Sequence, residues 1–510
     1  FRLAGSSSTH CDLATRACLT QICVMRMSVC SSVFALLWLP VLVFGSGHHC
    51  TKGLLFISEE TAPEVHVYDL DGNSPQLTRT LPVAAAASGL HATESEHAYV
   101  VVRNRADTAV KGTVHFLNSG LSAQDNAGHT HVVKDTPTVA DFHVTGWRPT
   151  HLTSSEGYIG IFMDASGPDN YNSSAVFVEE AALQSMTATS VPTEVHLDGA
   201  HHGVAYALGS GRFLTTVTPS SGSILPDNFI LTDAAGTILE EVGTEATPSC
   251  PGYHGAAHLD HTWMFGCGSG GLLRVDFDSH ATTPDLQWER LANPLDGTYR
   301  TGTVRSSKEG GVFVADYYNS TDRMSRHLWS VLPTTSEALE HHLMALERVV
   351  DERTDCSYVL DRAPVSSAGG VIVVVMHGEG NLTLTPIGPD GIPLSGMDVP
   401  IFPGGVDCEH LSLVAGYGEI YILDSSTPQL VTVDIREAYL GNSNAVSFVS
   451  LPFTPSSGAL SLPPSLACDV GPLTTTTTTS TMENVDGAVT SVLSTVLVML
   501  VGALQVLRAA

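Results

Sequence analysis

The chain has 510 residues, of which 43% are hydrophobic, so it is long enough for two or three domains or for one large all-β domain. It carries 52 acidic against 23 basic residues, and this net charge of −29 argues against nucleic acid as a partner, because phosphates require a basic face. Only 15% of the residues are charged, whereas 46 Gly and 27 Pro interrupt stretches rich in Val and Thr, which favours an all-β fold of short strands and turns.

The first residues have the layout of a leader followed by a secretory signal. Residues 1–24 contain no methionine, and we expect them to lie outside the native protein. From Met25 the sequence runs through a basic residue into the apolar stretch from Val33 to Phe44 and then into Gly45-Ser46-Gly47. This order predicts a signal peptide over 25–47, with cleavage after Gly47.

Seven similar phrases follow, each with a short strand, a polar turn and a second strand, as in a β-hairpin. They begin at Gly89, Pro149, His201, Tyr253, Thr301, Ala363 and Glu409. Their spacing of about fifty residues is typical of propeller blades of four strands. The sequence therefore predicts a seven-bladed β-propeller of YVTN/WD40-like architecture over 48–468.

Two segments interrupt the repeat. Between the first two phrases, an insertion carries His129-Thr-His131 and Asp135, and His-x-His on a loop can hold a metal ion. An exposed polar loop without metal is the alternative. After the fifth phrase, Leu339, Leu343, Leu346 and Val349 have the spacing of an amphipathic helix.

The C-terminal part predicts a tether. Residues 469–487 form a Thr-rich stalk, and the tail at 488–510 contains an apolar run of twenty residues, Ala488 to Leu507. Such a run fits either a single transmembrane anchor or a GPI attachment signal that is removed. Both alternatives place the protein at the extracellular face of the plasma membrane, with the tail as its only membrane contact, and secretion is the remaining possibility.

Cysteines and sequons agree with export. Asn172, Asn319 and Asn381 begin Asn-x-Ser/Thr triplets and are candidate glycosylation sites. Six cysteines follow the predicted cleavage site, and an even number suits disulfides in an oxidising compartment. Six cysteines can pair in fifteen ways. The simplest set is Cys50 with Cys468, Cys250 with Cys267 and Cys356 with Cys408. In this set the bridge between Cys50 and Cys468 would close the circular fold.

Five of the seven phrases carry a histidine at or near the start of their first strand. These histidines are His91, His151, His202, His254 and His410. The inner strands of a propeller face a common channel, so residues at one register approach one another. Neutral imidazoles gathered there favour zinc or another divalent first-row ion, although any one of them can instead satisfy backbone groups. Acidic side chains near in sequence are candidates for orienting them, namely Asp260, Asp407 and Glu409.

Three phrases are similar to those of the AztD type of bacterial periplasmic zinc metallochaperone. They are "WRPTHLTSSEGYIGIFMDASG", "HHGVAYALGSGRFL" and "CPGYHGAAHLDHTWMFGCGSGGLLRV", and the resemblance extends over about 54–418. It implies a β-propeller that delivers zinc to the binding protein of an importer. It also implies metal chemistry at His151, His202 and His254, a histidine-rich loop at His129 and His131, and a disulfide between Cys250 and Cys267. The stalk and the tail depart from the bacterial pattern.

The sequence thus favours an extracytoplasmic propeller that binds zinc and passes it to a metal-accepting surface protein. One alternative is a lactonase-like propeller hydrolase, since three histidines and a water on zinc can hydrolyse esters. Calcium-dependent sites of that kind use oxygen ligands, whereas the corresponding positions here are imidazoles. The other alternative is an adhesion or scaffold propeller whose histidines are structural.

Overall fold

The computed structural model describes most of the chain between residues 52 and 462, all within the compact unit His49–Ala510. The intervening residues that it does not describe are 73, 94–98, 105–109, 127–128, 166–170, 220–222, 244–247, 279–285, 294–297, 308–310, 320–325, 333–340, 345–354, 363–369, 389–390 and 417. The predicted leader, signal peptide, stalk and tail lie outside the described residues, as do Cys50 and Cys468. None of the helices in the described ranges has the length and apolar character needed to cross a bilayer.

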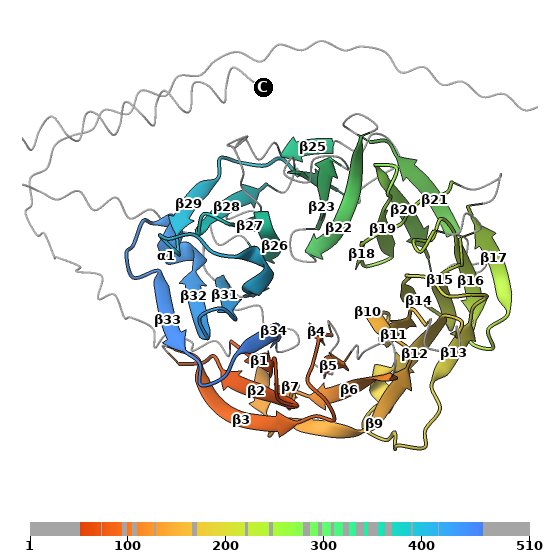
Figure 1. Ribbon diagram of the computed structural model, residues 1–510, viewed down its shortest axis with the longest axis horizontal. Helices are drawn as coiled ribbons and strands as arrows, with labels where there is room; N and C mark the ends of the chain where they lie inside the picture. Colours follow the sequence, from red (N-terminus) through yellow and green to blue (C-terminus); the bar gives the residue numbers. More distant parts are fainter. Residues whose placement is uncertain are drawn as a thin grey trace, which may run out of the picture. The chain divides into compact units, whose positions relative to one another are not determined.

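Eight sheets of four strands each surround a common axis, so the fold is an eight-bladed β-propeller (Figure 1). From the inner to the outer strand, blade 1 contains β34 (Pro455–Ser461), β1 (Leu54–Glu59), β2 (Glu64–Asp69) and β3 (Gln76–Pro82). Blade 2 contains β4 (Gly89–Ala92), β5 (Tyr99–Asn104), β6 (Gly112–Asn118) and β9 (Thr138–Gly146). Blade 3 contains β10 (Pro149–Ser155), β11 (Tyr158–Met163), β12 (Ser174–Glu179) and β13 (Thr193–His196). Blade 4 contains β14 (Ala205–Gly209), β15 (Arg212–Thr216), β16 (Phe229–Asp233) and β17 (Ile238–Val242).

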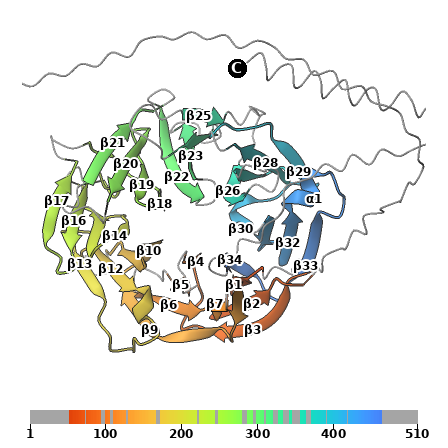
Figure 2. The same cartoon turned by 180° about the vertical axis from the view of Figure 1, so that it is seen from behind.

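The other four blades repeat this order, as the view from behind also shows (Figure 2). Blade 5 contains β18 (Ala256–Leu259), β19 (Thr262–Gly266), β20 (Leu272–Phe277) and β21 (Leu286–Leu291). Blade 6 contains β22 (Tyr299–Ser307), β23 (Val312–Asn319), β24 (Arg326–Val331) and β25 (His341–Met344). Blade 7 contains β26 (Asp355–Arg362), β27 (Val371–His377), β28 (Asn381–Ile387) and β29 (Met397–Pro400). Blade 8 contains β30 (Leu411–Gly416), β31 (Glu419–Asp424), β32 (Gln429–Asp434) and β33 (Val446–Ser450).

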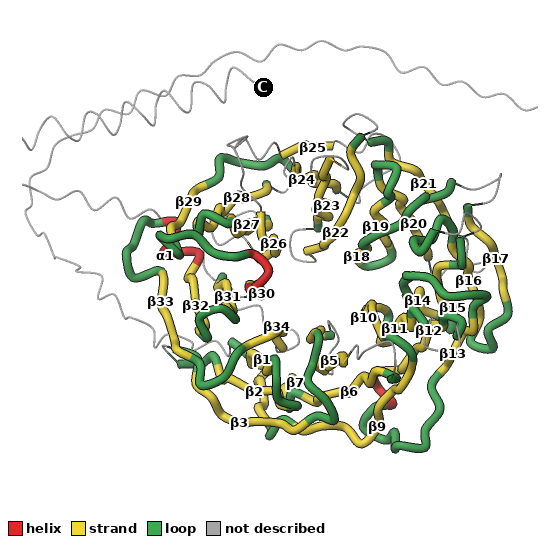
Figure 3. The backbone as a smooth tube through the Cα atoms, in the orientation of Figure 1, coloured by secondary structure: helices red, strands yellow, loops and turns green. Residues whose placement is uncertain are grey.

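Short helices and one hairpin decorate this ring of strands (Figure 3). The helices are η1 (Glu180–Ala182), η2 (Cys408–His410) and α1 (Ile435–Tyr439). The insertion in blade 2 folds as β7 (Leu121–Asn126) and β8 (His129–Lys134), a two-stranded sheet where the sequence predicts an irregular loop. Strand β25 occupies His341–Met344, within the segment where the sequence predicts an amphipathic helix.

The prediction of seven blades is therefore wrong by one. Each of the seven phrases contains at least one β-strand of one of blades 2–8. Blade 1 is different because its inner strand β34 comes from the C-terminal side and pairs with β1, as in Phe56 opposite Ala459. Two strands about 400 residues apart in the chain form no hairpin phrase, so the repeat misses them. The phrase from Ala363 is also displaced, because the inner strand of blade 7 ends before it, at Arg362.

Eight apolar clusters hold the described part of the ring together, one between each pair of neighbouring blades. Middle strands are buried on both faces and so consist of continuous apolar runs, such as Val371–His377 with six buried residues. The outer strand β3 is exposed at six of its seven positions. Inner strands also hydrogen-bond across blades, as where Ser155 Oγ donates to the Ala207 carbonyl at 2.8 Å.

Candidate metal centre

Three histidines from consecutive blades form one group, which we call the histidine trio: His151, His202 and His254. His151 is the third residue of β10, whereas His202 and His254 lie in the segments that lead into β14 and β18. The Nε2 atoms of His151 and His202 are 2.7 Å apart, and the ring centroids of His202 and His254 are 5.8 Å apart. The shared register at the start of three inner strands thus brings these side chains together.

A carboxylate that the sequence analysis did not single out orients the middle histidine. Asp164 is buried directly after β11, and its Oδ2 lies 2.9 Å from Nδ1 of His202. When the neutral imidazole donates its Nδ1 proton to this carboxylate, Nε2 keeps a lone pair, and Nε2 is the atom that faces His151. The signal in the sequence is an aspartate that ends the apolar run of a buried strand, "YIGIFMD".

The acids that the sequence offered for this task lie elsewhere. Asp260 lies in the turn between β18 and β19, and Asp407 and Glu409 lie at η2. His258 on β18 and His261 in its turn lie farther along the hairpin than His254, as predicted.

Burial keeps two histidines of the trio, His151 and His254, neutral. Desolvation and, to a smaller extent, the neighbouring imidazole of His202 lower the pKa of His151 to about 3. Desolvation also lowers the pKa of His254, with smaller contributions from His202 and Arg300. A metal ion binds only the deprotonated imidazole nitrogen, so at neutral pH both side chains are ready to act as ligands.

Two arginines flank the trio, and acidic groups balance them. Arg103 donates to the Thr150 carbonyl and contributes to the lowered pKa of His151. Arg300 lies over the ring of Tyr318 at 5.3 Å and contributes to the lowered pKa of His254. Asp164 on one side and Asp316 on the other supply negative charge, which a bound cation needs in such surroundings.

One histidine of the trio, His254, lines a cavity of about 380 Å³ together with Arg300, Asp316 and Tyr318. Nδ1 of His254 is buried and has no hydrogen-bond partner among the described residues. A buried polar atom without a partner costs about 1 to 3 kcal/mol. A metal ion would provide that partner.

The residues fit a metal ion after a modest adjustment. Two ligand nitrogens of tetrahedral zinc lie roughly 3.4 Å apart, so the 2.7 Å contact between His151 and His202 has to open slightly. The ligand nitrogens of the three histidines do not all lie within 4.8 Å of one another. Among the described residues, only Glu59, Glu64 and His66 bring three ligand atoms that close together. Capture of an ion therefore requires His254 to move toward the other two rings.

The two remaining predicted histidines do not join the trio. His91 lies on β4 with a buried Nε2, and desolvation and Arg103 lower its pKa to about 4. His410 ends η2 with 48% of its side chain exposed, and its Nδ1 lies 3.1 Å from Ser425 Oγ. In the part of the chain that the structure describes, neither side chain makes a hydrogen bond to a trio histidine.

The predicted metal loop is only partly described. His129 and His131 lie on β8, but their side chains are outside the described residues. Asp135 is exposed after this strand, and its backbone N–H donates to the Gly120 carbonyl at 2.8 Å.

The disulfide between Cys250 and Cys267 is confirmed, and it brackets His254. Cys408 is disulfide-bonded too, whereas the side chain of its predicted partner Cys356 lies outside the described residues.

Gly255, next to His254, has φ of 85°, and a Cβ there would lie 2.2 Å from the Gly302 carbonyl. Glycine is thus required by close contact with blade 6.

The predicted glycosylation sites differ in exposure. Asn172 is exposed, and Asn319 and Asn381 are partly exposed.

Comparisons with known proteins agree with this fold. No protein-family model matches the chain. The zinc chaperone AztD of Citrobacter koseri is 28% identical over 239 residues, which are 47% of this chain and 52% of that protein. The chain thus spans about half the length of this curated relative.

Solved structures extend the likeness to the whole propeller. The crystal structure of Citrobacter koseri AztD matches with a TM-score of 0.60 and 20% identity over 80% of this chain and 98% of that one. The apo form of AztD from the same organism matches with a TM-score of 0.61 and 21% identity over the same shares. The chain is therefore similar to AztD in part of its sequence and shares its β-propeller fold.

Proposed function

We propose that this protein binds zinc as cargo at the histidine trio and passes it to a metal-accepting protein. The observation that carries the proposal is the arrangement of His151 and His202, whose Nε2 atoms are 2.7 Å apart while Asp164 holds Nδ1 of His202. Three imidazoles, one of them oriented by a carboxylate, are a ligand set that holds zinc and leaves its fourth position for water or an incoming ligand. The likeness to a zinc chaperone supports the same cargo.

Transfer of zinc requires a site that the acceptor can reach and ligands that dissociate from the ion. The cavity beside His254 provides access, and the spread of the trio leaves one ligand free to move. His129 and His131, on the hairpin inserted in blade 2, are the proposed secondary ligands during hand-off.

We also propose that the protein works outside the cytoplasm, at the cell surface or secreted. The disulfide between Cys250 and Cys267 supports an oxidising compartment.

The test is zinc affinity of the full chain, measured by competition with a chromophoric chelator. His151→Ala, His202→Ala and His254→Ala should each weaken binding at least about a hundredfold, because loss of an outer-shell partner alone costs about ten- to a hundredfold. His410→Ala is the matched control, since His410 lies apart from the trio and half-exposed, and it should bind like the wild type. Equal affinity in all four variants would exclude the trio, and a wild-type protein without zinc affinity would favour the scaffold alternative.

A further inference from the structure

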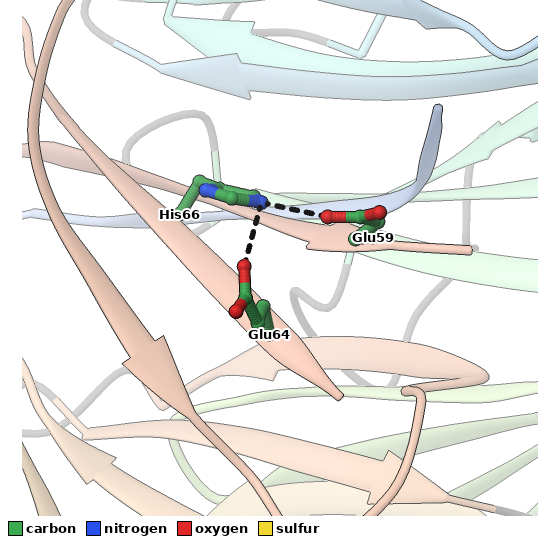
Figure 4. A group of neighbouring side chains, drawn as sticks. All are labelled: Glu59, Glu64 and His66. Carbon is green, nitrogen blue, oxygen red and sulfur yellow. Dashed lines mark hydrogen bonds and ion pairs between the residues drawn. The ribbon is translucent and has the colours of Figure 1, made fainter. Parts of the chain in front are cut away.

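A second group of possible metal ligands lies in blade 1, away from the three blades that carry the trio. Glu59, Glu64 and His66 converge there, as Figure 4 shows. Nε2 of His66 is 3.2 Å from Oε2 of Glu59 and 4.0 Å from Oε2 of Glu64. One ligand atom from each residue lies within 4.8 Å of the other two.

The register of the β1–β2 hairpin explains why these side chains meet. Ile57 pairs with His66 and Ser58 pairs with Val65. Side chains alternate between the faces of a sheet, so Glu59, Glu64 and His66 all project from the same face as Ile57. A β-bulge in the pairing with β34 at Ser58/Glu59 adjusts the end of β1.

The imidazole is held in place from two sides. The ring of His66 stacks on Phe453 with centroids 3.7 Å apart, and its Nδ1 lies 3.0 Å from Thr80 Oγ1 on the neighbouring strand β3. Only 8% of the His66 side chain is exposed. A ring fixed by such contacts is typical of a metal ligand whose other nitrogen is oriented by a partner.

The charge of the group is unbalanced. Two carboxylates face a single imidazole nitrogen, which has at most one proton to donate. Among the described residues, neither Glu59 nor Glu64 forms an ion pair with a lysine or an arginine. A divalent cation would neutralise both carboxylates and accept the lone pair of Nε2.

We infer that Glu59, Glu64 and His66 form a second site for a divalent first-row ion, zinc being the first choice. One imidazole and two carboxylates suit zinc, and three protein ligands leave a position for water. That position faces solvent, because 45% of the Glu64 side chain is exposed while Glu59 is only 18% exposed. The inference is independent of the histidine trio.

The site would brace the seam at which the ring closes. Phe453 leads into β34, and the Glu60 N–H donates to the Thr454 carbonyl at 2.9 Å. Ser58 Oγ and Ser456 Oγ are 2.8 Å apart at the same seam. A metal ion on Glu59 and His66 would therefore fix the imidazole that packs against the segment leading into the closing strand.

The experiment compares Glu64→Gln with Glu60→Gln in the full chain. Glu60 is the matched control because it is an exposed glutamate of the same turn and stands outside the group of three. Zinc should slow hydrogen exchange in a peptide covering residues 57–67 in the wild type and in Glu60→Gln. In Glu64→Gln the zinc concentration for half-maximal protection should rise by about tenfold or more, because one direct ligand is lost.

The result that overturns the inference is a hairpin that does not respond to zinc in the wild type, or one that responds equally in Glu64→Gln. In that case Glu59 and His66 are only hydrogen-bonded to each other. Glu59→Gln provides a second variant with the same expected loss. In His202→Ala, zinc should still slow hydrogen exchange in the hairpin. The experiment therefore distinguishes loss of zinc binding at the trio from loss of zinc binding at this second site.

Discussion

A single buried carboxylate decides which nitrogen of His202 faces the other histidines. Asp164 is 5% exposed and lies 38 positions before its partner in the chain. The histidines themselves are visible in the sequence, because they recur at one place of a repeat. The partner of Asp164 cannot be read from the sequence, because only the packing of blade 3 against blade 4 brings its carboxylate to Nδ1.

We predict that Asp164→Asn weakens zinc binding about ten- to a hundredfold, as expected for a partner that orients a ligand. The amide keeps the shape of the side chain but removes its charge, so the effect on the fold should be small. The measurement is chelator competition, with Asp198→Asn as the control because Asp198 is exposed in the neighbouring loop. Wild-type affinity in Asp164→Asn would show that the carboxylate does not orient the ligand.

At the scale of an element, a disulfide ties the two ends of the β18–β19 hairpin of blade 5. Cys250 precedes the hairpin and Cys267 follows it, so His254 is enclosed in a loop with a sequence separation of 17. Closing a loop of this size reduces the entropy of the unfolded chain, which stabilises the folded state by about 3 kcal/mol.

We predict that replacing both cysteines by serine lowers the free energy of unfolding by about this amount, about 3 kcal/mol. Urea unfolding followed by tryptophan fluorescence measures the loss, and Ser249→Ala provides a control next to the bridge. Zinc affinity should fall as well, since the segment with His254 loses its anchor. Equal unfolding midpoints for the double variant and the wild type would contradict the prediction.

In the molecule as a whole, buried neutral histidines make stability depend on pH. Desolvation lowers the pKa of His91 and of His201 to about 4, whereas an exposed histidine in the unfolded chain titrates near 6.5. As pH falls from about 6.5 toward 4, these histidines become protonated in the unfolded chain but stay unprotonated in the folded protein. Stability is therefore full above this window and decreases through it.

We predict that the metal-free protein loses up to about 1.4 kcal/mol per pH unit for each such histidine between pH 6.5 and 4. Urea unfolding at several pH values, with a chelator present, measures the slope. His201→Asn should make it shallower, because Asn does not titrate. A free energy of unfolding that is constant from pH 7 to 5 would contradict this account.

Much of the architecture is encoded in neighbouring residues. Alternating strands, turn residues and a period of about fifty residues predict a propeller, and a repeated histidine predicts a group of five, of which the structure brings three together. These features are local, because each strand pair of a repeat lies within a few residues along the chain. The pairing of Cys250 with Cys267 belongs with them, since the two residues bracket one hairpin.

Contacts between distant residues were decided by the tertiary structure alone. The eighth blade is completed by the pairing of β34 with β1, about 400 residues away. A sequence repeat does not predict that two such distant strands close the ring. The gathering of His151, His202 and His254, the contact of Asp164 with His202, and the convergence of Glu59, Glu64 and His66 depend on how strands pair and blades pack. Periodicity places a residue on a strand, but the ring geometry determines which other side chain it faces.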